Sequence, residues 1–276
     1  MIEIGKYNKL TVSKFVEFGL YLTDGEVEIL LPQKYITEEM AIDSEQEVFV
    51  YKDAENRVIA TTLIPKVTLD EFAALEVSQA TEFGAFMEWG IPKELFVPHS
   101  EQSVPFEVGQ KHVVFMYLDE KSNRLAASSK IDKFIRNTLF TVNEGDKVWI
   151  MVTKETPIGF SVIVNGRYKG LLYRNEVFRP LEIGDECAAY IKQIREDNKL
   201  DVTLNLISHK AIEPDAQKIL DLINQNDGFL NVTDKSSPDE IYRLTHLSKK
   251  AFKRAVGSLY KGKIISLEKT GLQLLK

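Results

Sequence analysis

The chain has 276 residues, of which 44% are hydrophobic, and this length accommodates two to four domains with buried cores. Its single cysteine, Cys187, excludes a disulfide framework and a cysteine-based zinc site, and is typical of a reducing compartment. The N-terminus has no apolar secretory segment, and no apolar run approaches the roughly 18 residues of a membrane span. We therefore expect a cytoplasmic protein without a membrane partner.

The formal net charge of −6 by itself disfavours nucleic-acid binding, but the charge is unevenly distributed. Residues 1–66 hold 7 Lys and Arg against 12 Asp and Glu, and residues 67–134 hold 6 against 11, so each segment carries −5. Residues 145–210 hold 10 against 9, and residues 214–276 hold 11 against 7, which gives +1 and +4. An acidic first half and a basic tail indicate a charged partner for one end of the chain.

A phrase built around glycine occurs three times, as EFGLYL from Glu17, EFGAFM from Glu82 and PIGFSV from Pro157. Segments of alternating polarity precede and follow each phrase, separated by Gly, Asn, Asp or Pro turns, so each unit is predicted to form five short strands. Five strands suit a small closed barrel of the oligonucleotide-binding (OB) type. Glycine weakens a strand unless the backbone bends sharply there, as at a barrel corner.

A second motif follows each phrase and is clearest in the third unit, where residues 170–176 read GLLYRNE. The order of the two motifs resembles the S1-type RNA-binding domain of the OB class. The second unit matches the first motif best, but has Pro98 where that family often has a stacking histidine, and the first unit has lost most of the second motif. The resemblance implies three S1-like barrels, which we place at residues 1–67, 68–138 and 143–208.

Residues 212–276 are predicted to form three helices and a β-hairpin, the pattern of a winged-helix domain. The first helix carries an apolar stripe and stops at Gly228, the second begins with Ser237 as its cap and Pro238 at its first position, and the third runs from the cap Ser248 to Gly262. Three S1-like units and this basic tail together resemble the conserved virulence factor B (CvfB) family of bacterial proteins. That resemblance implies a mainly β, multidomain fold and a post-transcriptional regulator of gene expression.

The third helix of the tail is a candidate recognition helix. At 100° per residue its apolar residues share one face, while Lys250, Arg254 and Lys261 lie opposite, with Lys249 and Lys253 on the flanks. A recognition helix carries its phosphate contacts in this way. The alternative is the solvated face of an amphipathic helix, which needs no ligand.

The third barrel is the predicted site for single-stranded RNA, because basic residues alternate with aromatic ones there. The candidates are Phe160, Arg167, Tyr168, Lys169, Tyr173 and Arg174. Weaker candidates in the second barrel are Phe83, Phe86, Phe96 and His99, since its negative charge repels phosphate. The alternative is that half of these aromatic residues point into the barrel, because strand residues alternate between faces. Phe83 and Phe86 in particular cannot both point outward from a regular strand unless a bulge lies at Gly84.

The sequence contains no set of residues that predicts catalysis. The segment GSLYKGK from Gly257 resembles a phosphate-binding loop, but it ends a helix and has Ile264 where Ser or Thr is required. No carboxylate cluster suited to a nuclease metal recurs in the repeats. We therefore expect a non-enzymatic RNA-binding protein without a cofactor or metal. The acidic barrels would act as a spacer, a protein-docking surface or a restraint on binding. The alternatives are a DNA-binding transcription regulator and an acidic protein-interaction scaffold.

Overall fold

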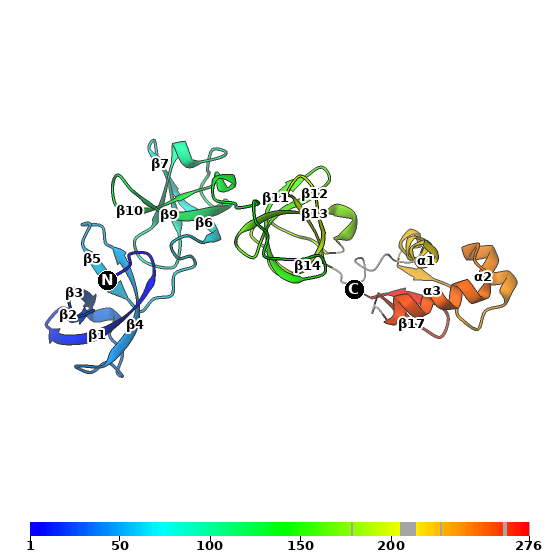
Figure 1. Ribbon diagram of the computed structural model, residues 1–276, viewed down its shortest axis with the longest axis horizontal. Coiled ribbons are helices and arrows are strands. Elements are labelled where there is room, and N and C mark those ends of the chain that lie inside the picture. The colour runs from blue at the N-terminus through cyan, green and yellow to red at the C-terminus, as the bar shows by residue number, and fades with distance from the viewer. Residues whose placement is uncertain (178, 205–213, 227, 262–263, 276) are drawn as a thin grey trace. The chain divides into compact units, whose positions relative to one another are not determined.

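The computed structural model describes residues 1–177, 179–204, 214–226, 228–261 and 264–275. It contains three closed, five-stranded β-barrels followed by a small domain of helices and a three-stranded sheet, which confirms the predicted fold class (Figure 1). In barrels 1 and 3 the strand order is first, second, third, fifth, fourth around the barrel, and the strands of barrel 2 pair in the same way.

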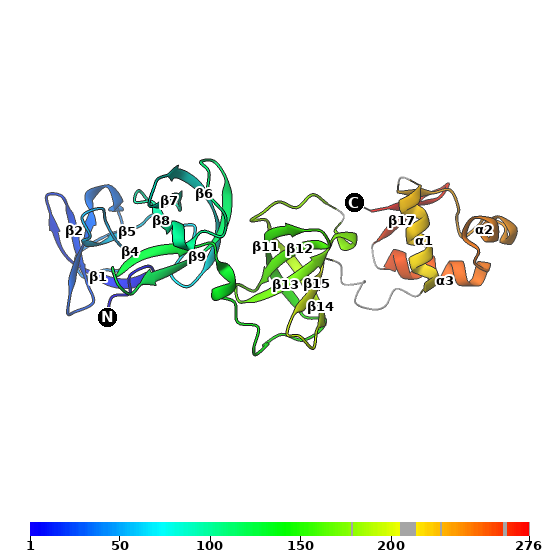
Figure 2. The same cartoon turned by 90° about the horizontal axis from the view of Figure 1, so that it is seen from above.

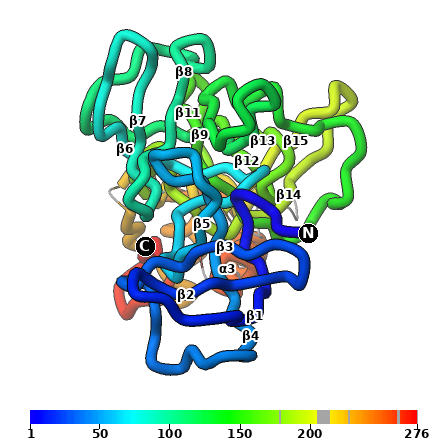
Figure 3. Tube along the Cα trace, turned by 90° about the vertical axis from the view of Figure 1, so that its left-hand side faces the viewer, coloured from blue at the N-terminus to red at the C-terminus, as the bar shows by residue number. Residues whose placement is uncertain are grey.

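Each barrel uses the five strands that the alternating pattern predicts. In barrel 1 they are β1 (Tyr7–Val16), β2 (Gly19–Thr23), β3 (Glu28–Pro32), β4 (Glu45–Lys52) and β5 (Val58–Thr61), whose path Figure 3 traces in blue. In barrel 2 they are β6 (Phe72–Ala80), β7 (Gly84–Glu88), β8 (Leu95–Pro98), β9 (Lys111–Asp119) and β10 (Arg124–Ser128). In barrel 3 they are β11 (Lys147–Thr156), β12 (Gly159–Val164), β13 (Tyr168–Tyr173), β14 (Glu186–Ile194) and β15 (Leu200–Thr203). Short 3-10 turns lie at η1 (Gln33–Tyr35), η2 (His99–Glu101), η3 (Ile131–Lys133) and η4 (Arg174–Glu176).

The glycine of the repeated phrase opens the second strand of every barrel. Gly84 pairs with Pro98 across β7 and β8, and a Cβ atom at Gly84 would lie 2.4 Å from the carbonyl oxygen of Val97. The same atom at Gly19 would lie 2.2 Å from the carbonyl oxygen of Leu31. The phrase therefore recurs because only glycine lets the second and third strands approach so closely at this corner.

Barrels 1 and 2 share one apolar cluster. The ring of Phe49 from barrel 1 lies 5.7 Å from that of Trp89 in barrel 2, edge to face. The backbone N–H of Leu69 donates to the carbonyl oxygen of Gly5 at 2.8 Å. The ammonium of Lys93 donates to the carbonyl oxygens of Lys52 and Asp53, both at 2.8 Å, and burial lowers the pKa of this ammonium. Aromatic packing and satisfied polar groups thus hold these two barrels together.

The C-terminal domain has the three predicted helices and the predicted hairpin, shown from above in Figure 2, and it has one further short strand after the first helix that makes the hairpin a three-stranded sheet. Its elements are α1 (Pro214–Gln225), β16 (Phe229–Leu230), α2 (Pro238–Thr245), α3 (Lys249–Lys261), β17 (Ile265–Leu267) and β18 (Leu272–Leu274). The predicted caps are confirmed, because the hydroxyl of Ser237 accepts from the N–H of Glu240, and that of Ser248 accepts from Ala251. Gly262, the predicted end of the third helix, lies outside the described residues. None of the described helices is long and apolar enough to span a membrane.

Candidate nucleic-acid interface

The second strand of each barrel presents its residues alternately to the core and to the surface. The residue directly after the glycine points inward, so Leu20, Ala85 and Phe160 are all buried. Phe160 is 7% exposed, and the outward position in barrel 3 is held by Ser161 instead. The predicted stacking role of Phe160 therefore has no support from the structure, because its side chain is buried.

The third strand of barrel 3 separates the two tyrosines that we predicted to act together. Tyr168 is 1% exposed, its ring packs at 5.2 Å against Phe140, and its hydroxyl donates to the carbonyl oxygen of Leu139 at 3.2 Å. Tyr173 is five residues further along, so it belongs to the opposite, outward row of β13 and is partly exposed. A base has no access to the ring of Tyr168, and Tyr173 remains the aromatic candidate of this strand.

Two cationic side chains lie over the ring of Tyr173. The guanidinium carbon of Arg195 lies 5.9 Å from the ring centroid and the ammonium of Lys192 lies 5.8 Å from it, both over the ring. Arg195 also donates to the Tyr173 hydroxyl at 2.6 Å and forms a two-point ion pair with Asp201. Hydrogen bonding to Asp201 raises the pKa of Arg195, so its charge is permanent. Lys192 pairs with the carboxylate of Glu176. The cluster offers a partly exposed aromatic ring beside two cations whose charges are balanced by Glu176 and Asp201, so the ring is what it presents to a base.

The remaining basic candidates of barrel 3 lie at the surface. Arg167 is exposed in the turn between β12 and β13, and its guanidinium carbon lies 5.6 Å from the centroid of the Tyr168 ring. Lys169 is exposed and pairs with Asp132 at 2.7 Å. Arg174 is exposed in η4, directly after Tyr173. Sequence reasoning missed Lys192 and Arg195, although both lie on or next to a predicted strand of the same barrel.

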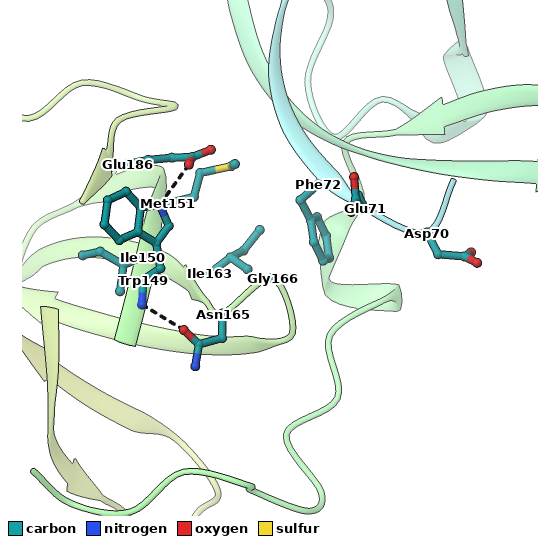
Figure 4. Close-up of a pocket in the computed structure, with 10 residues that line it drawn as sticks. All are labelled: Asp70, Glu71, Phe72, Trp149, Ile150, Met151, Ile163, Asn165, Gly166 and Glu186. Carbon is teal, nitrogen blue, oxygen red and sulfur yellow. Dashed lines mark hydrogen bonds between the residues drawn. The ribbon is translucent and has the colours of Figure 1, made fainter. Parts of the chain in front are cut away.

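A second exposed aromatic residue of barrel 3, Trp149 on β11, was also missed. It is 54% exposed, and its indole N–H donates to a carboxylate oxygen of Glu186 at 3.0 Å while its backbone N–H donates to the side chain of Asn165 at 2.8 Å (Figure 4). The hollow of about 310 Å³ beside it is also lined by the acidic residues Asp70 and Glu71. Three carboxylates around this hollow disfavour a phosphate.

The four weaker candidates come together in barrel 2. Phe86 on β7 and Phe96 on β8 face each other across the two strands with their ring centroids 5.1 Å apart, and both are partly exposed. Phe83 is 72% exposed because it lies in the turn before β7. Phe83 and Phe86 therefore both reach the surface without a bulge at Gly84. The bulge lies in the partner strand β6, between Val77 and Gln79. His99 is exposed, and its Nε2 lies 3.0 Å from the carbonyl oxygen of Thr81.

The recognition-helix candidate α3 has the predicted two faces. Its buried residues are Phe252, Ala255, Val256 and Leu259, which are the apolar residues that the 100° spacing places on one face. Lys250, Lys253 and Lys261 are exposed on the other side. Lys249 is half-buried and donates to the carbonyl oxygen of Ser236 at 2.7 Å, and Arg254 pairs with Asp215 of α1 at 3.0 Å. The three exposed lysines are therefore the best placed for phosphate, while Lys249 and Arg254 already have partners within the domain.

Comparisons with known proteins agree with this architecture. The S1 domain family model matches residues 4–63 and 71–130, and the CvfB-like winged helix domain model matches residues 217–274. The protein YitL of Bacillus subtilis is 30% identical over 274 residues, which cover 94% of this chain and 90% of YitL. The chain belongs to the conserved virulence factor B family. Conserved virulence factor B of Staphylococcus aureus (strain N315) is 28% identical over 251 residues, covering 87% of this chain and 82% of that protein.

A solved structure of a multidomain protein with nucleic acid binding domains from Streptococcus pneumoniae is also similar. It is 22% identical, covers 99% of this chain and 98% of its own, and superposes with a TM-score of 0.44. S1 and winged-helix domains are nucleic-acid-binding families and not enzyme families. The described residues contain no group of three or more His, Cys, Asp or Glu side chains placed to hold a metal ion.

Proposed function

We propose that this protein is a non-enzymatic, cytoplasmic RNA-binding protein that regulates gene expression after transcription. It grips single-stranded RNA with barrel 3 and the winged helix. The observation that carries the proposal is the partly exposed ring of Tyr173 with Lys192 and Arg195 over it. A base stacks on such a ring, and stacking of this kind binds single strands with little sequence preference.

The winged helix adds a second grip through charge. Lys250, Lys253 and Lys261 share the exposed side of α3, and their ammonium groups can reach phosphates without disturbing the buried face. Phosphate contacts position a nucleic acid but carry no sequence information. The acidic barrels 1 and 2 serve as spacer, protein-docking surface or restraint, because their net charge of −5 each opposes phosphate.

One binding panel tests the proposal against its alternatives. The full chain is titrated with labelled single-stranded RNA, single-stranded DNA of the same sequence and duplex DNA, at a low and a high salt concentration. We expect the tightest binding to single-stranded RNA, with an affinity that falls as salt rises. Preference for the duplex would instead identify a DNA-binding regulator that uses α3 in a groove. No affinity for any of the three would leave the acidic scaffold as the better account.

A further inference from the structure

A basic hollow of about 760 Å³ lies where the chain passes from barrel 2 to barrel 3. Five lysines line it, namely Lys111 on β9, Lys130 and Lys133 near η3, Lys154 on β11 and Lys169 on β13. Among the residues that the structure describes around it, Asp132 is the one carboxylate in the lining. The volume falls within the range of about 300–1,000 Å³ that ligand sites in proteins occupy.

The lysines of this hollow differ in their partners. Lys133 pairs with Glu101 at 2.8 Å, and Lys169 pairs with Asp132 at 2.7 Å. Lys111, Lys130 and Lys154 are exposed, and none of them forms an ion pair with another residue in the part of the chain that the structure describes. Lys130 is close enough to Glu101 to help lower the pKa of that carboxyl, but its ammonium, like those of Lys111 and Lys154, makes no direct ion pair with a described residue. Three exposed ammonium groups around one hollow attract an anionic chain.

The walls of the hollow are held in place by the segment that joins the barrels. The side chain of Asn137 accepts from the backbone N–H of Lys169 at 2.8 Å and donates to its carbonyl oxygen at 3.1 Å. The ring of Phe134 stacks on Phe115 of β9 with centroids 4.1 Å apart. These contacts fix the segment against both barrels, so the lysines do not depend on a loose linker for their positions.

We propose that this hollow is a track for the sugar–phosphate backbone of single-stranded RNA, leading onto the β12–β13 surface of barrel 3. Ser161 of β12 and Lys169 of β13 line the hollow and lie on the strands that OB barrels use for ligands. Ser161 takes the outward place that Phe86 has in barrel 2, so this surface contacts phosphate where barrel 2 presents rings. The acidic hollow beside Trp149 has the opposite charge and is not part of the track.

This inference rests on the proposed RNA binding, and it is tested with two charge-matched variants of the full chain. The first changes Lys111, Lys130 and Lys154 to Ala. The control changes Lys9, Lys66 and Lys121 to Ala, which are exposed lysines outside the hollow. Both variants lose three positive charges, so they share any effect of net charge. The affinity for a fluorescein-labelled oligouridine RNA is measured by anisotropy over a series of salt concentrations, and near-UV circular dichroism checks the fold.

Each phosphate contact on a single strand contributes about 0.7 to the slope of log K against log salt. The hollow variant should therefore flatten that slope by about 2, and the control variant should keep the wild-type slope. Equal slopes for the two variants would overturn the track while leaving RNA binding itself intact. Wild-type protein that fails to bind the RNA would overturn the proposed function first. If the hollow variant instead loses binding of a polyglutamate peptide and keeps RNA binding, the site belongs to an acidic protein partner and the track is refuted.

Discussion

Replacing Tyr173 separates the role of its ring from the role of its hydroxyl. Tyr173→Ala removes the ring beneath Lys192 and Arg195, whereas Tyr173→Phe keeps the ring and removes only the hydrogen bond from Arg195. Loss of one base stack costs about 1–3 kcal/mol, which is about 5-fold to 150-fold in Kd. Tyr173→Phe should change the affinity little, because Arg195 stays in place through its two-point pair with Asp201.

The measurement is the Kd for a labelled single-stranded RNA, determined by fluorescence anisotropy at one fixed salt concentration. Thermal unfolding of each variant accompanies it, because a ring that served only the barrel would change stability and not affinity. A folded Tyr173→Ala protein with the wild-type Kd would refute the stacking role of this tyrosine. An equal loss of affinity in Tyr173→Phe would show that the hydroxyl, and not the ring, is what the RNA needs.

Three further predictions follow from other surfaces. Changing Lys250, Lys253 and Lys261 of α3 to Ala should leave unfolding nearly unchanged and flatten the salt slope of RNA binding by about 2, whereas parallel slopes would make this face a solvated surface. Changing Phe86 and Phe96 to Ala should weaken RNA binding less than Tyr173→Ala, because barrel 2 carries −5, and a larger loss would place the main base contacts in barrel 2. The ring of His112 stacks on Phe106 with centroids 3.8 Å apart, and burial lowers the pKa of this histidine. The unfolded chain therefore takes up a proton more readily than the folded one, and stability falls as the pH drops below the ordinary pKa of about 6.5. His112→Phe should therefore reduce the drop in melting temperature between about pH 7.5 and about pH 5.5, and an unchanged drop would assign the acid sensitivity to other groups.

The fold was predictable because two patterns agree in each unit. Alternating polarity predicts the strands, and the glycine phrase marks where the second strand begins. The five strands, their turns and the winged-helix caps at Ser237 and Ser248 depend on local pattern and short-range hydrogen bonds. The two faces of α3 follow from helical spacing alone, and the structure buries the four residues that this spacing selects.

The site was less predictable because a sequence motif specifies residue types but does not specify whether their side chains point into the barrel or out of it. Phe160 and Tyr168 have the residue types of stacking residues, yet both side chains are buried. Their direction could have been found by aligning Phe160 with Leu20 and Ala85, and by counting five residues from Tyr168 to Tyr173. The contacts of Tyr173 with Lys192 and Arg195 could not have been found from the sequence, because these residues come close to Tyr173 only when the barrel closes.

The pairing of charges was also beyond the sequence. Arg254 was predicted to face phosphate, and on the helix it does lie on the exposed side. Its partner Asp215 is 39 residues away, in a helix whose packing against α3 no local pattern reveals. The same holds for Lys169 and Asp132, which are separated by 37 residues.

Photo-crosslinking tests the central claim most directly, because it reports where the RNA lies on the intact protein. A single-stranded RNA that contains 4-thiouridine is bound to the full chain, irradiated and digested, and the crosslinked peptides are identified by mass spectrometry. We predict crosslinks in the peptides that carry Tyr173 of barrel 3 and the exposed lysines of α3. Crosslinks confined to barrels 1 and 2, with none in these two regions, would contradict the account.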